Sequence, residues 1–144
     1  GHEDAPGGRD AYRDWVLEST EAVWTQFRAK FIANWEAHGA GDAYPADLFA
    51  DAAGRLALAR EREAFMDRLF ADSLGFAAAK MIRRILGLAH NIDLEWIEDE
   101  KVRATAEARA LALARDLMVN TSAYRAISAV TAAARRFNRL TPAF

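Results

Sequence analysis

The sequence contains no cysteine, only three prolines in 144 residues, and no excess of positive charge. Without cysteine it can form no disulfide, thiolate metal site or cysteine nucleophile, which is compatible with a reducing cytoplasm. Its 19 basic and 21 acidic residues give a net charge of −2, whereas binders of nucleic acid or anionic membranes need a large positive field. No apolar run approaches the roughly 20 residues of a membrane span, and no secretory signal opens the chain. We therefore expect a cytoplasmic protein that binds neither nucleic acid nor membrane.

The composition favours a helical, globular protein. Hydrophobic residues make up 52% of the sequence and charged residues 28%, which is typical of a folded domain. Alanine is abundant, and no stretch shows the clean apolar/polar alternation of a half-buried strand. The sequence therefore predicts an all-α fold of about five helices. Residues 1–9 are polar and rich in glycine and proline, so we expect a flexible linker there, followed by one helical subdomain over 10–144.

Capping residues and apolar periodicity place the predicted helices. Asp10 and Asp99 are expected to cap two of them, and Asp47 to cap a short turn. Leu74-Gly75 is expected to mark a break or kink before the third helix. The expected helices cover residues 11–36, 55–73, 76–89, 100–119 and 123–140, with one turn around 94–96. The first carries Trp15, Trp24 and Trp35. Core packing is the simpler interpretation of these rings, and a surface that docks another domain is the alternative.

The stretch 72–94 is the least polar long segment, yet it carries Lys80, Arg83 and Arg84. At about 100° per residue these cations fall on one face of a helix, with Gly87 in the middle of that face, where it would admit a ligand or backbone. The opposite face, with Ile82, Ile85, Leu86 and Ala89 among its residues, is expected to be buried.

No acid lies three or four residues from either arginine within this helix. Burying either charge unpaired would cost several kcal/mol, so a partner must come from elsewhere. It is either an acid such as Asp72, Asp93 or Glu95, or an anionic ligand such as a phosphate, which the arginine fork binds well. Spacing alone favours the acid.

His90, at the end of this helix, is more simply a capping residue than a base or ligand. We find no zinc motif, paired carboxylates, nucleophile elbow, P-loop or dinucleotide fingerprint. The sequence therefore offers no catalytic or metal-binding residue.

Four short strings in this stretch resemble the C-terminal region of the S-methyl-5-thioribose kinases, which belong to a protein-kinase-like superfamily that also includes aminoglycoside phosphotransferases. They are Leu74-Gly75-Phe76-Ala77, Met81-Ile82-Arg83-Arg84, Leu86-Gly87-Leu88-Ala89-His90 and Asp93-Leu94. The likeness covers roughly residues 10–119 and includes the aromatic pattern of the first helix. It implies a two-lobed fold that phosphorylates the 1-hydroxyl of 5-methylthioribose with ATP and Mg²⁺, in methionine salvage.

The resemblance implies roles for the residues of the cationic face. Arg83 and Arg84 match the family's twin arginines, which bind the sugar and stabilise the transferring phosphoryl group, so the ligand interpretation now becomes the favoured one. Lys80, Gly87 and His90 are expected to support them. The sequence departs from the family at Ala78, where a glycine is usual, and at Lys80, where an acid is often found.

The family's glycine-rich nucleotide loop, its lysine, its HGD-type catalytic loop and its DPE metal motif do not occur in this sequence. We therefore expect the C-terminal fragment of a sugar kinase, inactive alone, whose partners are methylthioribose or a related sugar and the missing N-terminal portion that binds ATP and Mg²⁺. A homodimer is also expected. The alternative is a free-standing helical module that binds or interacts without catalysis.

Overall fold

The computed structural model describes residues 8–39, 43–88 and 92–140. Over these residues the chain is helical and contains no β-strand, so the predicted all-α fold is confirmed. The expected linker lies mostly outside the described residues. The elements, in chain order, are α1 (Asp10–His38), η1 (Ala46–Phe49), α2 (Ala52–Leu86), α3 (Ile92–Glu95), α4 (Glu100–Val119), η2 (Thr121–Ala123) and α5 (Ile127–Asn138).

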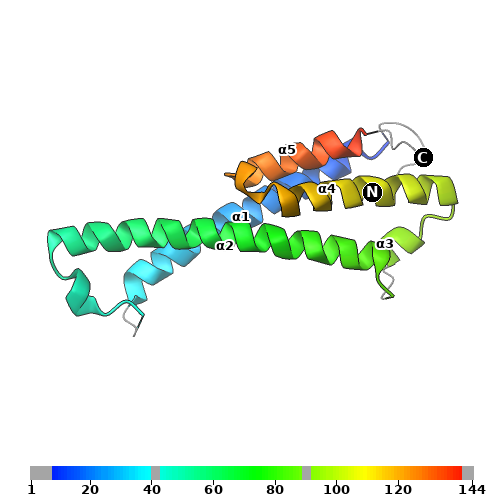
Figure 1. The fold of residues 1–144 in the computed structure, drawn as a ribbon. Coiled ribbons are helices and arrows are strands. Elements are labelled where there is room, and N and C mark those ends of the chain that lie inside the picture. The colour runs from blue at the N-terminus through cyan, green and yellow to red at the C-terminus, as the bar shows by residue number, and fades with distance from the viewer. Residues whose placement is uncertain (1–7, 40–42, 89–91, 141–144) are drawn as a thin grey trace.

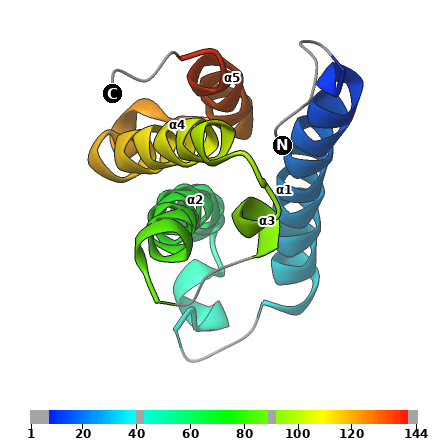
Figure 2. The same ribbon diagram turned by 90° about the vertical axis from the view of Figure 1, so that its right-hand side faces the viewer.

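The long helix α2 runs the length of the molecule; α4 packs over its C-terminal half, and α5 packs against α4 and α1 (Figures 1 and 2). The N-terminal half of α1 lies beside α5, while its C-terminal half follows the first half of α2 (Figures 1 and 2). Aromatic rings join these two helices: Trp24 lies 4.8 Å from Phe70, and Phe31 stacks on Phe65 at 5.7 Å. Trp35 lies 5.3 Å from Phe65. The core interpretation thus holds for Trp24, which packs against the buried cluster, whereas Trp35 is half-buried among rings outside it.

Helix α2 is continuous over 35 residues, so the predicted break at Leu74-Gly75 is wrong. Glycine costs a helix interior about 1 kcal/mol relative to alanine, which packing readily offsets. Leu74 and Ala78, on either side of Gly75, are both buried against the core. Tertiary packing therefore carries the helix through the glycine.

Replacing Gly75 by alanine should stabilise the protein. A β-carbon at this position would meet no atom within 4 Å, so the variant gains helix propensity without a clash. We expect the free energy of unfolding to rise by about 0.5–1 kcal/mol, measured by urea denaturation. Gly87→Ala is the control and should destabilise, because its β-carbon would collide with the carbonyl oxygen of Arg83. A loss of stability in Gly75→Ala would show that the helix is broken there.

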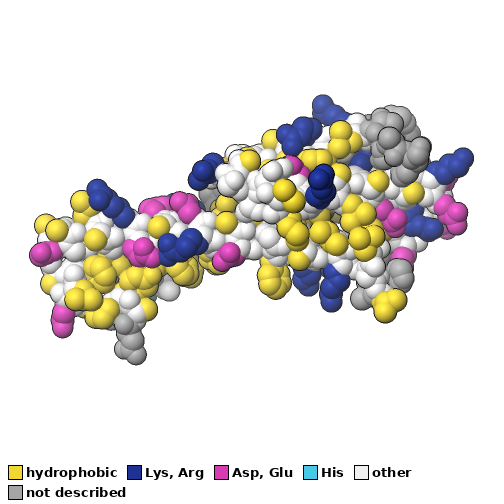
Figure 3. Space-filling model, in the orientation of Figure 1, with side chains coloured by type: hydrophobic (Ala, Val, Ile, Leu, Met, Phe, Trp, Pro, Cys, Tyr) yellow, Lys and Arg dark blue, Asp and Glu magenta, His cyan; other side chains and the backbone are white. Residues whose placement is uncertain are grey.

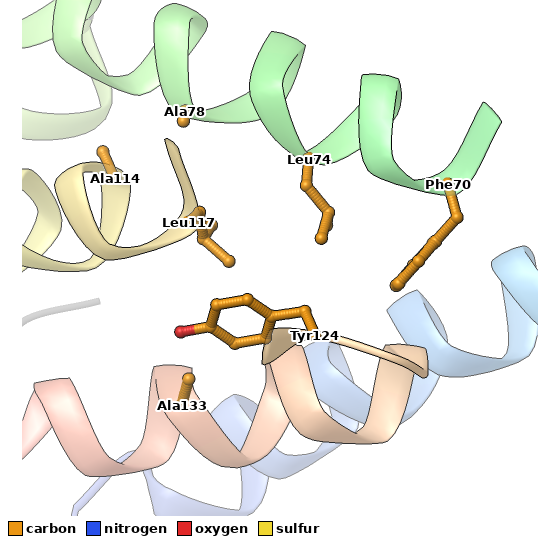
Figure 4. Close-up of a cluster of buried hydrophobic side chains, with 7 residues drawn as sticks. All are labelled: Phe70, Leu74, Ala78, Ala114, Leu117, Tyr124 and Ala133. Atoms are coloured by element: carbon orange, nitrogen blue, oxygen red, sulfur yellow. The ribbon is translucent and has the colours of Figure 1, made fainter. Parts of the chain in front are cut away.

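The buried core lies where α2, α4 and α5 meet (Figure 4). The ring of Tyr124, just after η2, lies between the α2 and α4 side chains and the α5 helix. Ala78 and Ala114 are fully buried, and their small side chains let α2 and α4 approach closely. The cluster consists of Phe70, Leu74, Ala78, Ala114, Leu117, Tyr124 and Ala133.

A polar network fastens Tyr124 to the two helices beside it. Its hydroxyl donates a hydrogen bond to Asp116 of α4, which also accepts one from Asn120 at 2.7 Å. Arg136 of α5 lies 3.5 Å from the same carboxylate. The hydrogen bonds from Tyr124 and Asn120 lower the pKa of Asp116. Burial and the bond to Asp116 raise the pKa of Tyr124 to about 12.

Tyr124 should make the stability of the fold sensitive to alkaline pH. Its pKa is higher in the folded chain than the ordinary value of 10.0, so its contribution is complete below pH 10 and lost as pH rises towards about 12. Tyr124→Phe should lower the free energy of unfolding by about 1–2 kcal/mol at neutral pH and abolish Tyr124's share of the alkaline loss. Urea denaturation across this pH range measures both effects. An unchanged alkaline profile in the variant would refute the assignment.

Other predicted boundaries and caps also differ from the structure. Asp10 is the first residue of α1 and makes no side-chain cap, so its predicted capping role is wrong. Helix α2 begins at Ala52 rather than at residue 55. Helix α5 begins at Ile127 rather than Ala123, because Tyr124 enters the core on extended backbone between η2 and α5. Asp47 lies inside η1 and does not cap it. The cap at Asp99 is confirmed, since its carboxylate accepts hydrogen bonds from the amides of Lys101 and Val102.

The chain exposes more surface than its mass requires. A compact monomer of 16.0 kDa exposes about 7,400 Å², whereas this chain exposes 10150 Å². None of the 29 residues of α1 is buried. No helix in the described part of the chain is both long enough and apolar enough to cross a membrane. The excess surface reflects an extended arrangement of helices rather than a compact one (Figure 1).

Candidate functional site

The predicted cationic face lies on the C-terminal third of α2. We call Phe76, Lys80, Arg83 and Arg84 the α2 strip; all four side chains are exposed. Along a helix with a rise of about 1.5 Å per residue, Lys80 and Arg83 are separated by about 4.5 Å of axis. Figure 3 shows basic side chains projecting from this part of α2 beside hydrophobic ones. The expected clustering of the three cations on an accessible face is therefore present.

The other face of α2 fixes the direction of the strip. Leu74 and Ala78 are buried, and Met81 and Ile82 pack against the same core. Because these side chains hold one face against α4, the strip has to face away from the bundle. Leu86 does not follow the prediction for the apolar face, because it is 71% exposed.

Lys80 and Arg83 have no hydrogen-bond or ion-pair partner among the residues that the structure describes. Asp72, one proposed partner, is exposed and makes no ion pair with either of them. Arg84 and Glu95 each have an interaction of their own, so neither is free. His90 and the side chain of Asp93 lie outside the described residues. For Arg83, an acid supplied by the described part of the chain is thus ruled out.

Gly87 lies at the C-terminal end of α2, where its lack of a side chain has a structural role. It follows the last residue of α2, and its amide donates a hydrogen bond to the Arg83 carbonyl at 2.9 Å. A side chain would collide with that same oxygen. Gly87 thus ends α2 next to Arg83, and the idea that it admits a ligand stays a prediction.

Removing Lys80 or Arg83, neither of which has an ion-pair partner among the described residues, should leave the fold intact. Lys80→Ala and Arg83→Ala should each change the free energy of unfolding by less than about 0.5 kcal/mol, because both side chains are exposed. Arg62→Ala, on the same helix, is the control. That side chain is only 14% exposed, lies over the Trp35 ring at 5.8 Å and reaches Glu36 at 3.5 Å. Loss of the Arg62 side chain should lower the free energy of unfolding by about 1 kcal/mol or more, measured by urea denaturation. An equal loss in Arg83→Ala would assign Arg83 a structural role.

The structure contains a cleft that the sequence did not predict. It has a volume of about 880 Å³ and lies between α1, α4 and α5, with Met81 as the contribution from α2. Its cations are largely engaged: Arg13 pairs with Asp10, Arg135 with Asp14, and Arg109 donates to the Leu140 carbonyl. Residues from three distant segments build it, so no single stretch of sequence could signal it. It does not include the strip's cations.

Large apolar side chains are exposed on both sides of the chain. Trp15 on α1 is 60% exposed and stacks only on Tyr12 among the described rings. Trp96, after α3, is 76% exposed. An exposed apolar surface with tryptophans is what the fragment hypothesis predicts, whereas a free-standing module would close its surface. Trp15 thus fits the docking alternative rather than the core.

No protein-family model matches the chain, but curated proteins are similar to it in sequence. It is 40% identical over 141 residues to methylthioribose kinase 1 of Oryza sativa subsp. japonica, and 34% identical over 127 residues to the methylthioribose kinase of Escherichia coli O45:K1. These matches cover 96% and 88% of this chain but 32% and 30% of the relatives. The chain thus spans about a third of their length, at their C-terminal end. The resemblance seen in the sequence is confirmed, and the chain belongs with the C-terminal helical region of the methylthioribose kinase family.

Proposed function

We propose that this chain supplies the sugar-binding helical part of a kinase that transfers a phosphoryl group from ATP to the 1-hydroxyl of 5-methylthioribose, releasing ADP. The observation that carries the proposal is the α2 strip, where Lys80 and Arg83 are exposed and have no partner among the described residues. One of the strings that resemble the kinases contains Arg83 and Arg84, and the relatives are named as methylthioribose kinases. The enzyme would serve methionine salvage in the cytoplasm.

In this proposal Arg83 and Arg84 act on the substrate through charge and shape. A guanidinium offers a planar fork of donors that fits phosphoryl oxygens, and it keeps its charge at any working pH. Catalysis of phosphoryl transfer depends mainly on positioning and on neutralising charge that spreads over the transferring group. The tight end of α2 at Gly87 supports Arg83 by fixing its backbone. Lys80 adds a third positive charge to the same face, and His90 stays a predicted supporting residue.

The described residues include no group of three histidine or acidic side chains that could hold a metal ion, so they do not fit a Mg²⁺ site. In the proposal, ATP, Mg²⁺ and the catalytic base belong to the portion of the kinase that precedes the matched region. The large exposed surface of the chain supports a partner of this kind. The free-standing module remains the alternative, and the homodimer remains a prediction.

The proposal is tested by comparing the chain alone with the chain fused behind the first two thirds of the rice kinase. We expect no ATP-dependent phosphorylation of methylthioribose from the chain alone and clear activity from the fusion. In the fusion, Arg83→Ala should lower kcat by about 100-fold, because a charge that stabilises the transition state is lost.

Arg125→Ala is the matched control, since Arg125 is also exposed but lies far from the strip in the sequence, between η2 and α5. It should leave kcat unchanged. Activity from the chain alone would show that it contains the catalytic groups. A folded but inactive fusion, or equal kcat for the two arginine variants, would count against the sugar-binding role.

A further inference from the structure

Phe76 is an exposed aromatic residue that the packing of the chain does not explain. It is 75% exposed and makes no ring contact with another described aromatic side chain. The other two phenylalanines of α2, Phe65 and Phe70, pack on rings of α1. Single exposed apolar side chains are common on protein surfaces, so the informative feature of Phe76 is its position on the same face of α2 as Lys80 and Arg83.

The position of Phe76 relates it to the cations rather than to the core. Seven residues separate it from Arg83, so on a helix the two lie within about 20° of each other and about 10 Å apart along the axis. Lys80 lies between them, one turn after Phe76. Leu74 and Ala78, on the other face, are buried against the core. The strip thus has an apolar end at Phe76 and a cationic end at Arg83.

A molecule of matching polarity has an apolar group at one end and an anionic or reacting group at the other. The sugar named in the relatives carries a methylthio group on carbon 5, and the hydroxyl that is phosphorylated is on carbon 1. Six bonds separate that oxygen from the methyl carbon, which is roughly 7–8 Å in an extended conformation. This length fits along the strip between Phe76 and the guanidinium of Arg83.

We infer that Phe76 contacts the methylthio group of the substrate and sets the preference for a sugar with an apolar thioether at carbon 5. The inference rests on the proposed function and adds a specificity-determining residue to it. A thioether sulfur on an aromatic ring gains about 0.3–1.5 kcal/mol, and burial of the methyl group adds to this. Phe76 would thereby orient the sugar so that its other end meets Arg83.

The test uses the active fusion and two sugars, methylthioribose and 5-deoxyribose, which lacks the thioether but keeps the ring and the 1-hydroxyl. Phe76→Ala should raise KM for methylthioribose about tenfold with little change in kcat, because uniform binding is lost. For 5-deoxyribose, kcat/KM should change less than about twofold, since the missing contact was absent from the start. Phe76→Met, which keeps an apolar and polarisable side chain, should retain most of the preference.

Trp15→Ala, another exposed aromatic on a different helix, is the control and should not alter the ratio of kcat/KM for the two sugars. The inference is refuted if Phe76→Ala lowers kcat/KM equally for both sugars, as expected if preceding protein merely covers Phe76. It is also refuted if neither value changes. Both outcomes leave the fusion active, so they are distinct from a failure of the proposed function, in which methylthioribose is not phosphorylated at all.

Discussion

The close packing of α2 against α4 is the constraint on which the rest of the structure depends. Fully buried alanines on both helices, Ala78 and Ala114, allow the two backbones to approach, and Leu74 and Leu117 fill the space beside them (Figure 4). This contact holds one face of α2 against the bundle over its C-terminal half. It keeps the helix continuous through Gly75, and it directs Phe76, Lys80 and Arg83 outward.

The chain buries little apolar surface for its size. The buried hydrophobic side chains concentrate where α2, α4 and α5 meet, while α1 contributes no buried residue. Helix α1 is instead held by half-exposed rings and by ion pairs such as that between Asp14 and Arg135 at 3.2 Å. Exposed contacts of this kind contribute little to stability. The distribution is that of an extended helical layer rather than of a compact core, in a chain that spans about a third of its relatives' length.

The ion pairs of the chain show why the α2 strip is distinctive. Elsewhere many arginines meet acids, including pairs between helices such as Arg62 with Glu36 and pairs within α2 such as Arg68 with Glu61. The bond from Arg68 lowers the pKa of Glu61 and keeps that acid charged. Lys80 and Arg83 have no such acid among the described residues. Local neutralisation is thus common on this surface, whereas Lys80 and Arg83 show none in the described part of the chain.

The sequence by itself determined the all-α class, the extent of α1 to within two residues at each end, the Asp99 cap of α4 and the clustering of the three cations on one face. These follow from local rules: helical periodicity, capping chemistry and composition act over a few residues. Its strings also identified the related kinases, which the curated relatives confirmed.

What the sequence could not determine were features set by contacts between distant segments. The predicted break at Gly75 failed because packing on α4 outweighs the cost of one glycine. The start of α5 failed because Tyr124 is drawn into the core and held by Asp116. The exposure of Phe76 and Leu86 was decided by tertiary structure, and so was the lack of an acid beside Arg83 among the described residues. Only the arrangement of the helices determines which side of a periodic helix is covered.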